Sequence, residues 1–167
     1  MVTDTAETVR ELVAEIPDPE IPVLTIADLG ILRDVRVDAA GGVEVDITPT
    51  YSGCPALEVI RGDIEATLRR HGHTAVTVRT VLAPAWTTDW MSEEGRRKLR
   101  EYGIAPPEPV RTGGTGMTAG LRLEVSVLCP QCGSAHTSEL SHFGSTPCKS
   151  LFRCSGCHEP FEHFKAH

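Results

Sequence analysis

The sequence predicts an α+β protein, in which a small mixed sheet with helices on one face is followed by a smaller β module. The N-terminal part of the chain changes between helical and strand periods in the order helix, two strands, helix, strand. A segment rich in proline and glycine follows. Beyond it, an alternating strand pattern runs into the first of two Cys-x-x-Cys pairs. We therefore expect two folded parts joined by a linker.

Composition places these parts at residues 1–104, 105–119 and 120–167. A chain of 167 residues can form one domain with a sizeable core, or a domain of about 100 residues with a small appendage. The 12 prolines and 15 glycines favour the second arrangement. Residues 105–119 are first stiff and then flexible, so they cannot build a core. They are predicted to be the linker.

Charge and the lack of long apolar runs narrow the class of protein. A formal net charge of −7 argues against a protein that tracks nucleic-acid phosphates, because that binding depends on clustered lysine and arginine. No apolar run approaches the roughly 18 residues of a membrane span, and the acidic N-terminus lacks the apolar core of a signal peptide. A cytoplasmic protein is expected. There, the six cysteines are expected to be metal ligands or reactive thiols rather than disulfides.

The first element is an amphipathic helix that ends at Pro17. Its start is expected to be capped by the pair Asp4-x-x-Glu7. Four apolar residues at helical spacing form its buried face: Val9, Leu12, Val13 and Ile16. The proline ends the helix because the residue before a proline disfavours helical backbone.

An acidic loop, Asp18-Pro19-Glu20-Ile21-Pro22, follows this helix, and a third carboxylate, Asp28, stands before Leu29-Gly30. Two interpretations of the loop stay open. It is either a solvated acidic turn, or a stiff support that aims Asp18 or Glu20 at a metal beside Cys54.

Two strands and a helix are expected next. The strands alternate apolar and polar residues on either side of a hairpin turn at 38–42. The apolar spacing then becomes helical at Leu57, Ile60, Ile64 and Leu68. The sequence His71-Gly72-His73 is expected to end that helix.

Cys54 stands where the strand period changes to the helical period. Pro55 suits the first helical position, so Cys54 is expected at or next to the N-cap. The N–H groups of Ala56 and Leu57 would then point toward its sulfur, and the helix dipole would favour thiolate over thiol. The alternative is a small buried residue that fills a turn.

A third strand is expected at 75–82, followed by Trp86 and Trp90 in a loop. The two tryptophans either anchor a partner or close the core. Ser92 is expected to cap a further helix with acidic residues in its first turn and basic residues later. Three of its larger residues are expected to pack inward: Leu99, Tyr102 and Ile104.

The C-terminal part begins with a predicted strand at 121–127 and holds two knuckles, Cys129-Pro-Gln-Cys132 and Cys154-Ser-Gly-Cys157. Each knuckle holds two sulfurs near one point, and two knuckles give the tetrahedral thiolate site that zinc prefers. We therefore predict a zinc ribbon in which the metal is structural and supplies much of the folding free energy. Iron of the rubredoxin kind would accept the same four ligands. Cys148 lies outside both knuckles, either as a packed thiol or as a ligand for something transient.

Several motifs together resemble a known family. Asp18-Pro19-Glu20-Ile21-Pro22, Asp28-Leu29-Gly30 and Thr50-x-x-x-Cys54-Pro55 resemble the iron-sulfur assembly domain of SufT-like proteins. The run from Pro84 to Ser92, the ribbon, and Phe143-Gly-Ser-Thr-x-Cys148-Lys149 resemble the PaaD family, accessory subunits of the bacterial phenylacetyl-CoA epoxidase system of phenylacetate degradation. The resemblance covers nearly the whole chain.

This resemblance implies a factor that helps assemble or insert an iron-sulfur or iron cofactor into an oxygenase component, such as the ferredoxin-type reductase or the di-iron hydroxylase. By position, Cys54 would be the functional thiol. Asp18, Glu20 and Asp28 would be candidate partners for a transient metal. Iron-sulfur assembly proteins would be further partners. No flavin, nicotinamide or di-iron motif is present, so no turnover by this chain alone is expected.

Two alternatives come from other classes of protein. A metal-dependent enzyme could use Cys54 as a nucleophile, but no histidine partner is evident near it in sequence. A zinc-ribbon nucleic-acid binder is disfavoured, because the segment from Ala119 onward holds four basic and four acidic residues.

Overall fold

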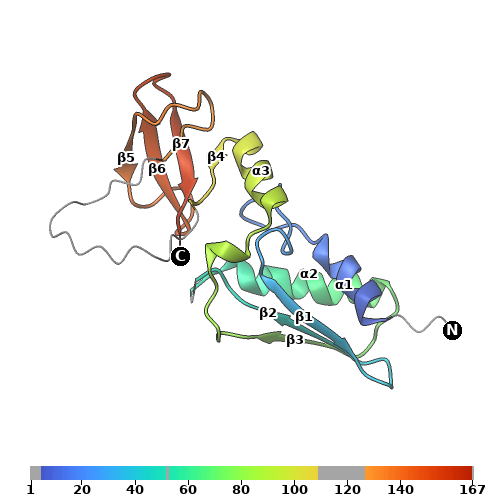
Figure 1. Ribbon diagram of the computed structural model, residues 1–167. Helices are drawn as coiled ribbons and strands as arrows, with labels where there is room; N and C mark the ends of the chain where they lie inside the picture. The colour runs from blue at the N-terminus through green and yellow to red at the C-terminus, as the bar shows by residue number, and fades with distance from the viewer. Residues whose placement is uncertain (1–4, 52, 109–126, 167) are drawn as a thin grey trace, which may run out of the picture. The chain divides into compact units, whose positions relative to one another are not determined.

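The computed structural model describes residues 5–51, 53–108 and 127–166. The chain forms two compact units, Met1–Gly95 and Arg96–His167. The predicted α+β class with a C-terminal ribbon is confirmed (Figure 1). Within the described residues, no helix has both the length and the apolar character needed to cross a membrane.

The first unit contains a three-stranded mixed sheet with two helices on one face (Figure 1). Its elements are α1 (Ala6–Ala14), β1 (Leu32–Val37), β2 (Val43–Ile47), α2 (Ala56–Arg70), β3 (Val76–Thr80) and the short 3-10 helix η1 (Thr88–Trp90). Strand β2 is central, antiparallel to β1 and parallel to β3. Because α2 connects the two parallel strands, it begins at the edge of the sheet where β2 ends.

The core of this unit lies between the sheet and helices α1 and α2. Its fully buried side chains come from all of these elements: Val9, Val13, Val45, Ile47, Ile60, Ile64 and Leu68. The predicted capping pair is wrong. Thr5 is the N-cap of α1, and its hydroxyl accepts a hydrogen bond from the N–H of Thr8 at 3.3 Å. Asp4 lies outside the described residues.

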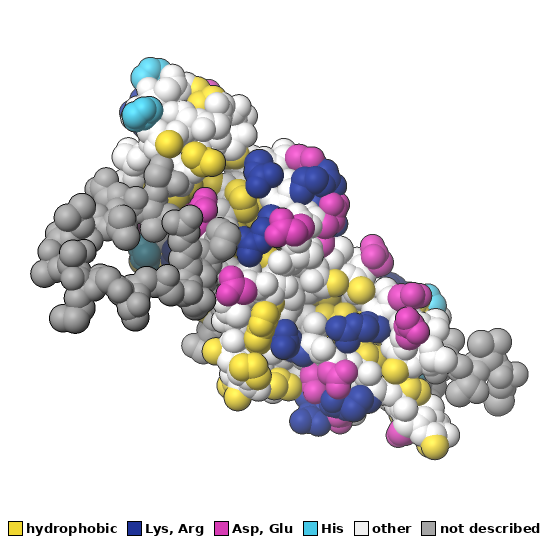
Figure 2. Space-filling model, in the orientation of Figure 1, with side chains coloured by type: hydrophobic (Ala, Val, Ile, Leu, Met, Phe, Trp, Pro, Cys, Tyr) yellow, Lys and Arg dark blue, Asp and Glu magenta, His cyan; other side chains and the backbone are white. Residues whose placement is uncertain are grey.

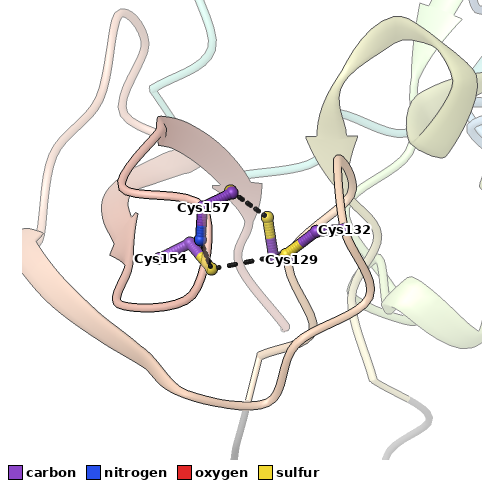
Figure 3. A group of neighbouring side chains, drawn as sticks. All are labelled: Cys129, Cys132, Cys154 and Cys157. Atoms are coloured by element: carbon purple, nitrogen blue, oxygen red, sulfur yellow. Dashed lines mark hydrogen bonds between the residues drawn. The ribbon is translucent and has the colours of Figure 1, made fainter.

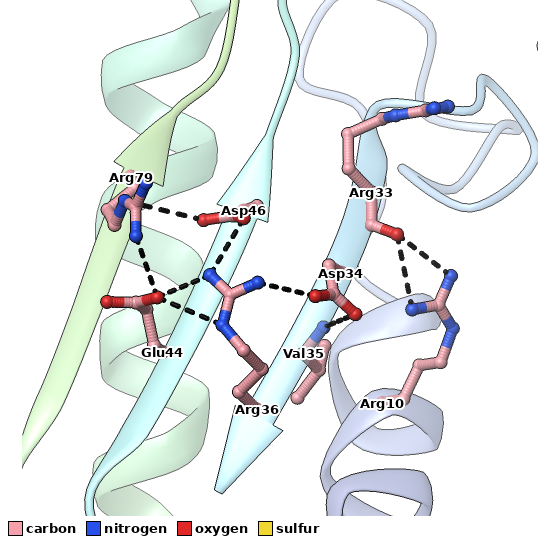
Figure 4. Close-up of polar contacts among 8 residues, drawn as sticks. All are labelled: Arg10, Arg33, Asp34, Val35, Arg36, Glu44, Asp46 and Arg79. Carbon is pink, nitrogen blue, oxygen red and sulfur yellow. Dashed lines mark hydrogen bonds and ion pairs between the residues drawn. The ribbon is translucent and has the colours of Figure 1, made fainter.

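The other face of the sheet carries a network of ion pairs (Figure 4). The Arg36 guanidinium contacts Glu44 and lies 2.8 Å from Asp46 Oδ2, and Arg79 contacts Glu44 at 2.9 Å. Arg36 lowers the pKa of the Glu44 carboxyl. Opposite charges face each other across neighbouring strands, so the arginines offset the carboxylates. The network explains why every second residue of these strands is polar.

The loop between α1 and β1 packs tightly at Gly30, which has φ +70°. A Cβ built there would stand 2.6 Å from the Trp90 carbonyl oxygen. Both the positive φ and this backbone contact require glycine. The glycine therefore lets the segment around η1 close over the loop.

Replacing Gly30 with alanine should lower the free energy of unfolding by about 2 kcal/mol or more, because left-handed backbone and a steric clash with Trp90 add. The matched control is Gly62→Ala in α2, where a Cβ meets no atom within 4 Å. That change should raise stability by about 1 kcal/mol. Urea denaturation followed by tryptophan fluorescence measures both. Equal stability of Gly30→Ala and the wild type would contradict this view of the loop.

The two tryptophans take different positions. Trp86 is buried and donates a hydrogen bond from its indole Nε1 to the Leu29 carbonyl at 2.8 Å. Trp90 is partly exposed, and the Arg33 guanidinium lies 3.5 Å from its ring centroid. Of the two interpretations left open, the structure places Trp86 in the core.

The second unit contains a four-stranded sheet in the order β4-β7-β6-β5. Its strands are β4 (Ile104–Ala105), β5 (Thr137–Ser141), β6 (Lys149–Cys154) and β7 (Pro160–Phe164). Helix α3 (Glu93–Tyr102) precedes β4 and begins in the first unit, which ends at Gly95. Ser92 caps α3 as predicted, since its hydroxyl accepts a hydrogen bond from the Gly95 N–H at 2.8 Å. The expectation for Tyr102 is wrong, because its side chain is 58% exposed.

Ala105, the first residue of the predicted linker, belongs to β4 and is buried. The rest of the predicted linker from residue 109 lies outside the described residues, as does the predicted strand 121–127 up to residue 126. The boundaries at 1–104, 105–119 and 120–167 therefore stay predictions.

Candidate functional site

Cys54 lies in the loop between β2 and α2, directly before Pro55, the N-cap of α2. It is partly exposed. The Ala56 N–H donates to its thiol, as predicted, but the Leu57 N–H donates to the Cys54 carbonyl oxygen at 3.3 Å instead. Thr50, which precedes it in the same loop, also makes a side-chain hydrogen bond to the thiol. The sulfur is therefore held by local groups but is not sealed from solvent.

The environment raises the pKa of the Cys54 thiol above its ordinary value of 9.0. Partial burial is the largest cause, and the negative charges of Glu20 and Asp18 add to it. The hydrogen bonds from Ala56 and Thr50 act in the opposite direction and do not outweigh these effects. The prediction that the helix dipole makes Cys54 a thiolate is therefore wrong for the metal-free protein. Besides burial, the cause is the acidic loop, which brings two carboxylates near the sulfur.

A thiol beside two carboxylates favours the binding of a cation. Near neutral pH the thiol keeps its proton, so it is a weak nucleophile. A bound metal cation would displace that proton and would be attracted by Glu20 and Asp18, whose charges oppose a free thiolate. The same arrangement that disfavours covalent catalysis thus suits a metal-thiolate bond.

Replacing Glu20 with glutamine should lower the pKa of Cys54, because it removes the larger of the two carboxylate effects. The backbone N–H of Glu20, which donates to Asp18 Oδ1, is unchanged by this substitution. Alkylation of Cys54 by iodoacetamide at pH 8 should therefore be faster in Glu20→Gln, and its pH midpoint should shift down. Glu65→Gln on α2 is the control and should leave the profile unchanged. An unshifted midpoint in Glu20→Gln would contradict the proximity of this carboxylate.

The three candidate carboxylates have different environments. Asp18 is buried, and its Oδ1 accepts hydrogen bonds from the N–H groups of Glu20 and Ile21 at 2.9 and 2.8 Å. It is therefore not a solvated turn residue. Asp28 is buried too, and its Oδ1 accepts a hydrogen bond from the Ser92 hydroxyl at 2.9 Å.

Of the three, only Asp18 and Glu20 are among the groups that shift the pKa of Cys54. The structure brings these two toward the thiol and places Asp28 in contact with the start of α3. Among the described residues, the one group of cysteine, histidine and carboxylate side chains arranged to hold a metal ion lies elsewhere, in the second unit. The surroundings of Cys54 are thus not a preformed metal cage.

The group in the second unit consists of the four knuckle cysteines (Figure 3): Cys129, Cys132, Cys154 and Cys157. Their sulfurs all lie within 4.8 Å of one another. Two sulfur–sulfur distances are 3.7 Å, from Cys129 to Cys157, and 3.6 Å, from Cys132 to Cys154. Four sulfurs bound at about 2.3 Å to one tetrahedral centre are about 3.8 Å apart. The cluster therefore fits zinc.

Backbone N–H groups stabilise negative charge in this cluster. The N–H groups of Cys157 and Gly156 donate to Cys154 Sγ and lower the pKa of that thiol to about 6. The Glu159 N–H acts in the same direction on Cys157, but burial and the neighbouring sulfurs outweigh it and raise that pKa to about 12. Four thiolates side by side need a cation to offset their repulsion, which a dication supplies.

The two knuckles share one backbone feature. The residue after each second cysteine has a positive φ, +73° at Gly133 and +66° at His158. Glycine adopts this conformation without strain, whereas histidine does not. His158→Gly should therefore raise the free energy of unfolding of the ribbon by about 1 kcal/mol, measured by thermal unfolding. Gly133→Ala is the matched control and should lower it by a similar amount. A loss of stability in His158→Gly would indicate that its ring makes a contact that outweighs its backbone strain.

Cys148, the remaining cysteine, is a packed thiol. It is 4% exposed, and its Sγ lies 3.1 Å from the Thr146 hydroxyl. The next residue, Lys149, is also buried and forms an ion pair with Glu162 at 2.8 Å. This ion pair and the Thr50 contact to Cys54 are missing from the sequence predictions. The contact of Thr50 with Cys54 could have been predicted, because both residues belong to the motif Thr50-x-x-x-Cys54. Nothing in the sequence pairs Lys149 with Glu162.

Comparisons with known proteins match the two parts of the chain to two families. A family described as iron-sulfur cluster assembly protein matches residues 6–79, and the PaaD zinc beta ribbon domain matches residues 115–165. A crystal structure of a domain of unknown function from Bacillus anthracis covers 56% of this chain and 90% of its own, with a TM-score of 0.53 and 25% identity.

Two curated proteins show how far the similarity extends. An Fe-S protein maturation auxiliary factor of Porphyromonas gingivalis is 35% identical, over 57% of this chain and 90% of its own length. A protein of Escherichia coli, named for the 1,2-phenylacetyl-CoA epoxidase of which it is one component, is 51% identical, over 92% of this chain and 88% of its own length. Since this similarity runs through both units, the chain belongs to the PaaD family.

Proposed function

We propose that this chain is an accessory component of a phenylacetyl-CoA epoxidase system that helps assemble or insert an iron-sulfur or iron cofactor into an oxygenase component, and that it is not itself a catalyst. The family membership supports the accessory role, and the match to the iron-sulfur assembly family supports the cofactor step. The recipient would be the reductase or the hydroxylase component.

One observation carries this proposal: a partly exposed thiol, Cys54, lies near two carboxylates at the start of a helix. A single sulfur with oxygen ligands binds iron less firmly than a four-thiolate site. Weak binding suits a protein that passes its cargo to another, because transfer requires release. Asp18 and Glu20 are proposed to attract the cation, whereas Asp28, bonded to Ser92, is proposed to keep the acidic loop in place.

The alternative of a thiol enzyme fits the structure less well. Thiol catalysis needs a thiolate, which a histidine or another cation usually stabilises. The groups that shift the pKa of Cys54 include no histidine, and the net shift is upward. A nucleic-acid binder is disfavoured by the balanced charge of the ribbon segment.

The four knuckle cysteines are proposed to hold a structural zinc ion. When bound, zinc would supply the tetrahedral cross-link that fixes the two knuckles, and four protein ligands leave no position for water. Among the described residues, the buried hydrophobic cluster that includes two of these cysteines is small: Ala105, Val127, Cys129, Cys154 and Phe161, with Phe152 and Cys157 packed against it. So small a core needs such a cross-link to stay folded.

Metal content tests the proposal directly. Each epoxidase component is purified from cells with and without this chain, and its iron is measured. At least one component should lose most of its iron when the chain is absent. The chain itself, purified with and without air, should contain zinc in both cases and iron in varying amounts. Full iron loading of every component without this chain would contradict the proposal.

A further inference from the structure

Cys132 differs from the other cysteines of this chain in its exposure. All six cysteines lie within the described residues, and Cys132 is the one among them that is exposed. Of the other knuckle cysteines, Cys129 and Cys154 are buried, and Cys157 is partly exposed. A reagent dissolved in water therefore reaches the four-sulfur cluster first at the Cys132 sulfur.

A second sulfur lies next to this exposed one. Cys132 Sγ is 3.6 Å from Cys154 Sγ (Figure 3). This close pair takes one cysteine from each knuckle, as does the pair of Cys129 and Cys157 at 3.7 Å. The N–H groups of Gly156 and Cys157 donate to Cys154 Sγ at 3.3 and 3.5 Å. These hydrogen bonds stabilise negative charge on the sulfur of Cys154, and a thiolate is the form that attacks a neighbouring sulfur.

An exposed thiolate with a second thiolate beside it is the arrangement found in cysteines that respond to oxidants. The first sulfur is oxidised to a sulfenic acid, and the second condenses with it to a disulfide. The two cysteines outside the knuckles are less suited to the first step. The raised pKa of Cys54 keeps its thiol protonated near neutral pH, and Cys148 is buried.

Hydrogen peroxide is an oxidant that fits this site. It is small and uncharged, and Figure 2 shows mainly uncharged atoms over β5, β6 and β7 on the drawn face. In the proposed function the chain works beside an oxygenase, and partial reduction of O₂ at such an enzyme yields hydrogen peroxide. The exposed sulfur would meet the oxidant where it is formed.

We propose that the ribbon is a peroxide-sensitive switch, in which hydrogen peroxide oxidises Cys132, a disulfide forms between Cys132 and Cys154, and the structural zinc is released. This inference rests on the proposed zinc ion, and it is independent of the role of Cys54. It assigns the exposed ligand of the cluster a second property besides metal binding.

The oxidation takes two steps. In the first, the Cys132 thiolate attacks one oxygen of hydrogen peroxide, the O–O bond breaks, and a sulfenic acid forms while hydroxide leaves and takes up a proton to become water. In the second, the Cys154 thiolate attacks the Cys132 sulfur, the S–S bond forms, and the S–O bond breaks to release a second hydroxide, which also becomes water. Overall, two thiolates lose two electrons, and one hydrogen peroxide with two protons becomes two waters.

This reaction removes two of the four zinc ligands. The sulfurs that remain, those of Cys129 and Cys157, are too few for a closed tetrahedral site, so the ion is lost. The disulfide joins the same two knuckles that zinc joins, which keeps them connected in the oxidised chain. A thiol reductant reverses the disulfide by exchange, after which zinc binds again.

Zinc release measures the switch in the full-length chain. The wild type, treated with hydrogen peroxide, should release its zinc to a colorimetric chelator, and mass spectrometry of its peptides should find Cys132 linked to Cys154. Dithiothreitol followed by zinc should restore the metal content. Cys54→Ser and Cys148→Ser should release zinc as the wild type does, because neither residue belongs to the cluster.

Two histidine variants form a matched pair. Three thiolates and one histidine make a common structural zinc site, so both variants are expected to bind the metal. Cys132→His removes the exposed sulfur and should release zinc under peroxide at least about tenfold more slowly than the wild type. Cys157→His keeps Cys132 and Cys154 and should release zinc at nearly the wild-type rate. If either variant is purified without zinc, the disulfide map of the wild type decides.

The outcomes separate this inference from the proposed function. Zinc retained in excess peroxide, or a disulfide found within one knuckle, would overturn the switch and leave the structural zinc in place. Release from zinc-loaded Cys132→His at the wild-type rate would overturn the switch too. A wild-type chain purified without zinc would contradict the proposed zinc ion, and the switch with it.

Discussion

Cells that produce only the Cys54→Ser variant should lose phenylacetyl-CoA epoxidase activity, although the variant protein should fold and keep its zinc. Serine oxygen is a poor ligand for iron near neutral pH, because the hydroxyl does not ionise as a thiol does. Cys54 is partly exposed and outside the core, so the loss of its sulfur should change the free energy of unfolding by less than about 1 kcal/mol. Activity and growth on phenylacetate measure the first effect, and thermal unfolding measures the second.

Cys148→Ser is the control for this variant. Cys148 is buried and contacts Thr146, so its replacement should lower stability slightly and leave epoxidase activity in place. The contrast between a partly exposed thiol that matters for activity and a buried thiol that matters for stability is the expected result. Full complementation by Cys54→Ser would contradict the role assigned to this residue.

The second large effect is expected from Cys132→Ser. This side chain is exposed, so its replacement removes little packing, and any large loss comes from the metal site. Structural zinc in small modules contributes about 10–16 kcal/mol of apparent binding free energy, and removal of one of four thiolates weakens that binding strongly. We expect loss of zinc and rapid proteolysis of the ribbon.

Zinc content and limited proteolysis measure the effect of Cys132→Ser. Cys148→Ser, which leaves all four ligands in place, should keep one zinc per chain and a protease-resistant ribbon. The same two results in Cys132→Ser would refute a structural metal at this cluster.

Features with a local cause could be predicted from the sequence. The change from strand to helical period at Cys54 locates α2, and the spacing within each Cys-x-x-Cys pair places two sulfurs on one turn. Ser92 and the helix stop at Gly72 also follow from neighbouring residues. These features depend on a few consecutive positions, so the sequence contains the information that determines them.

Features that depend on distant residues could not be predicted. The pKa of Cys54 rises in part because the loop between α1 and β1 brings Glu20 and Asp18 toward it, and no pattern near Cys54 indicates that loop. Asp28 contacts Ser92, 64 positions away, instead of the thiol. Tyr102 fits the helical spacing of Leu99, but it is 58% exposed whereas Leu99 is fully buried, and spacing along the helix does not indicate where the neighbouring elements end.

Transfer of iron from this chain to an epoxidase component is the most direct test of the central claim. The claim is that the Cys54 thiol binds the transferred iron, whereas the four knuckle sulfurs hold only a structural metal. Wild-type chain and the variants Cys54→Ser and Cys148→Ser are incubated without air with iron and with each iron-depleted component, and the iron bound by the component is measured over time. We predict transfer by the wild type and by Cys148→Ser, and no transfer above the rate of free iron by Cys54→Ser. Transfer by Cys54→Ser at the wild-type rate would contradict the claim.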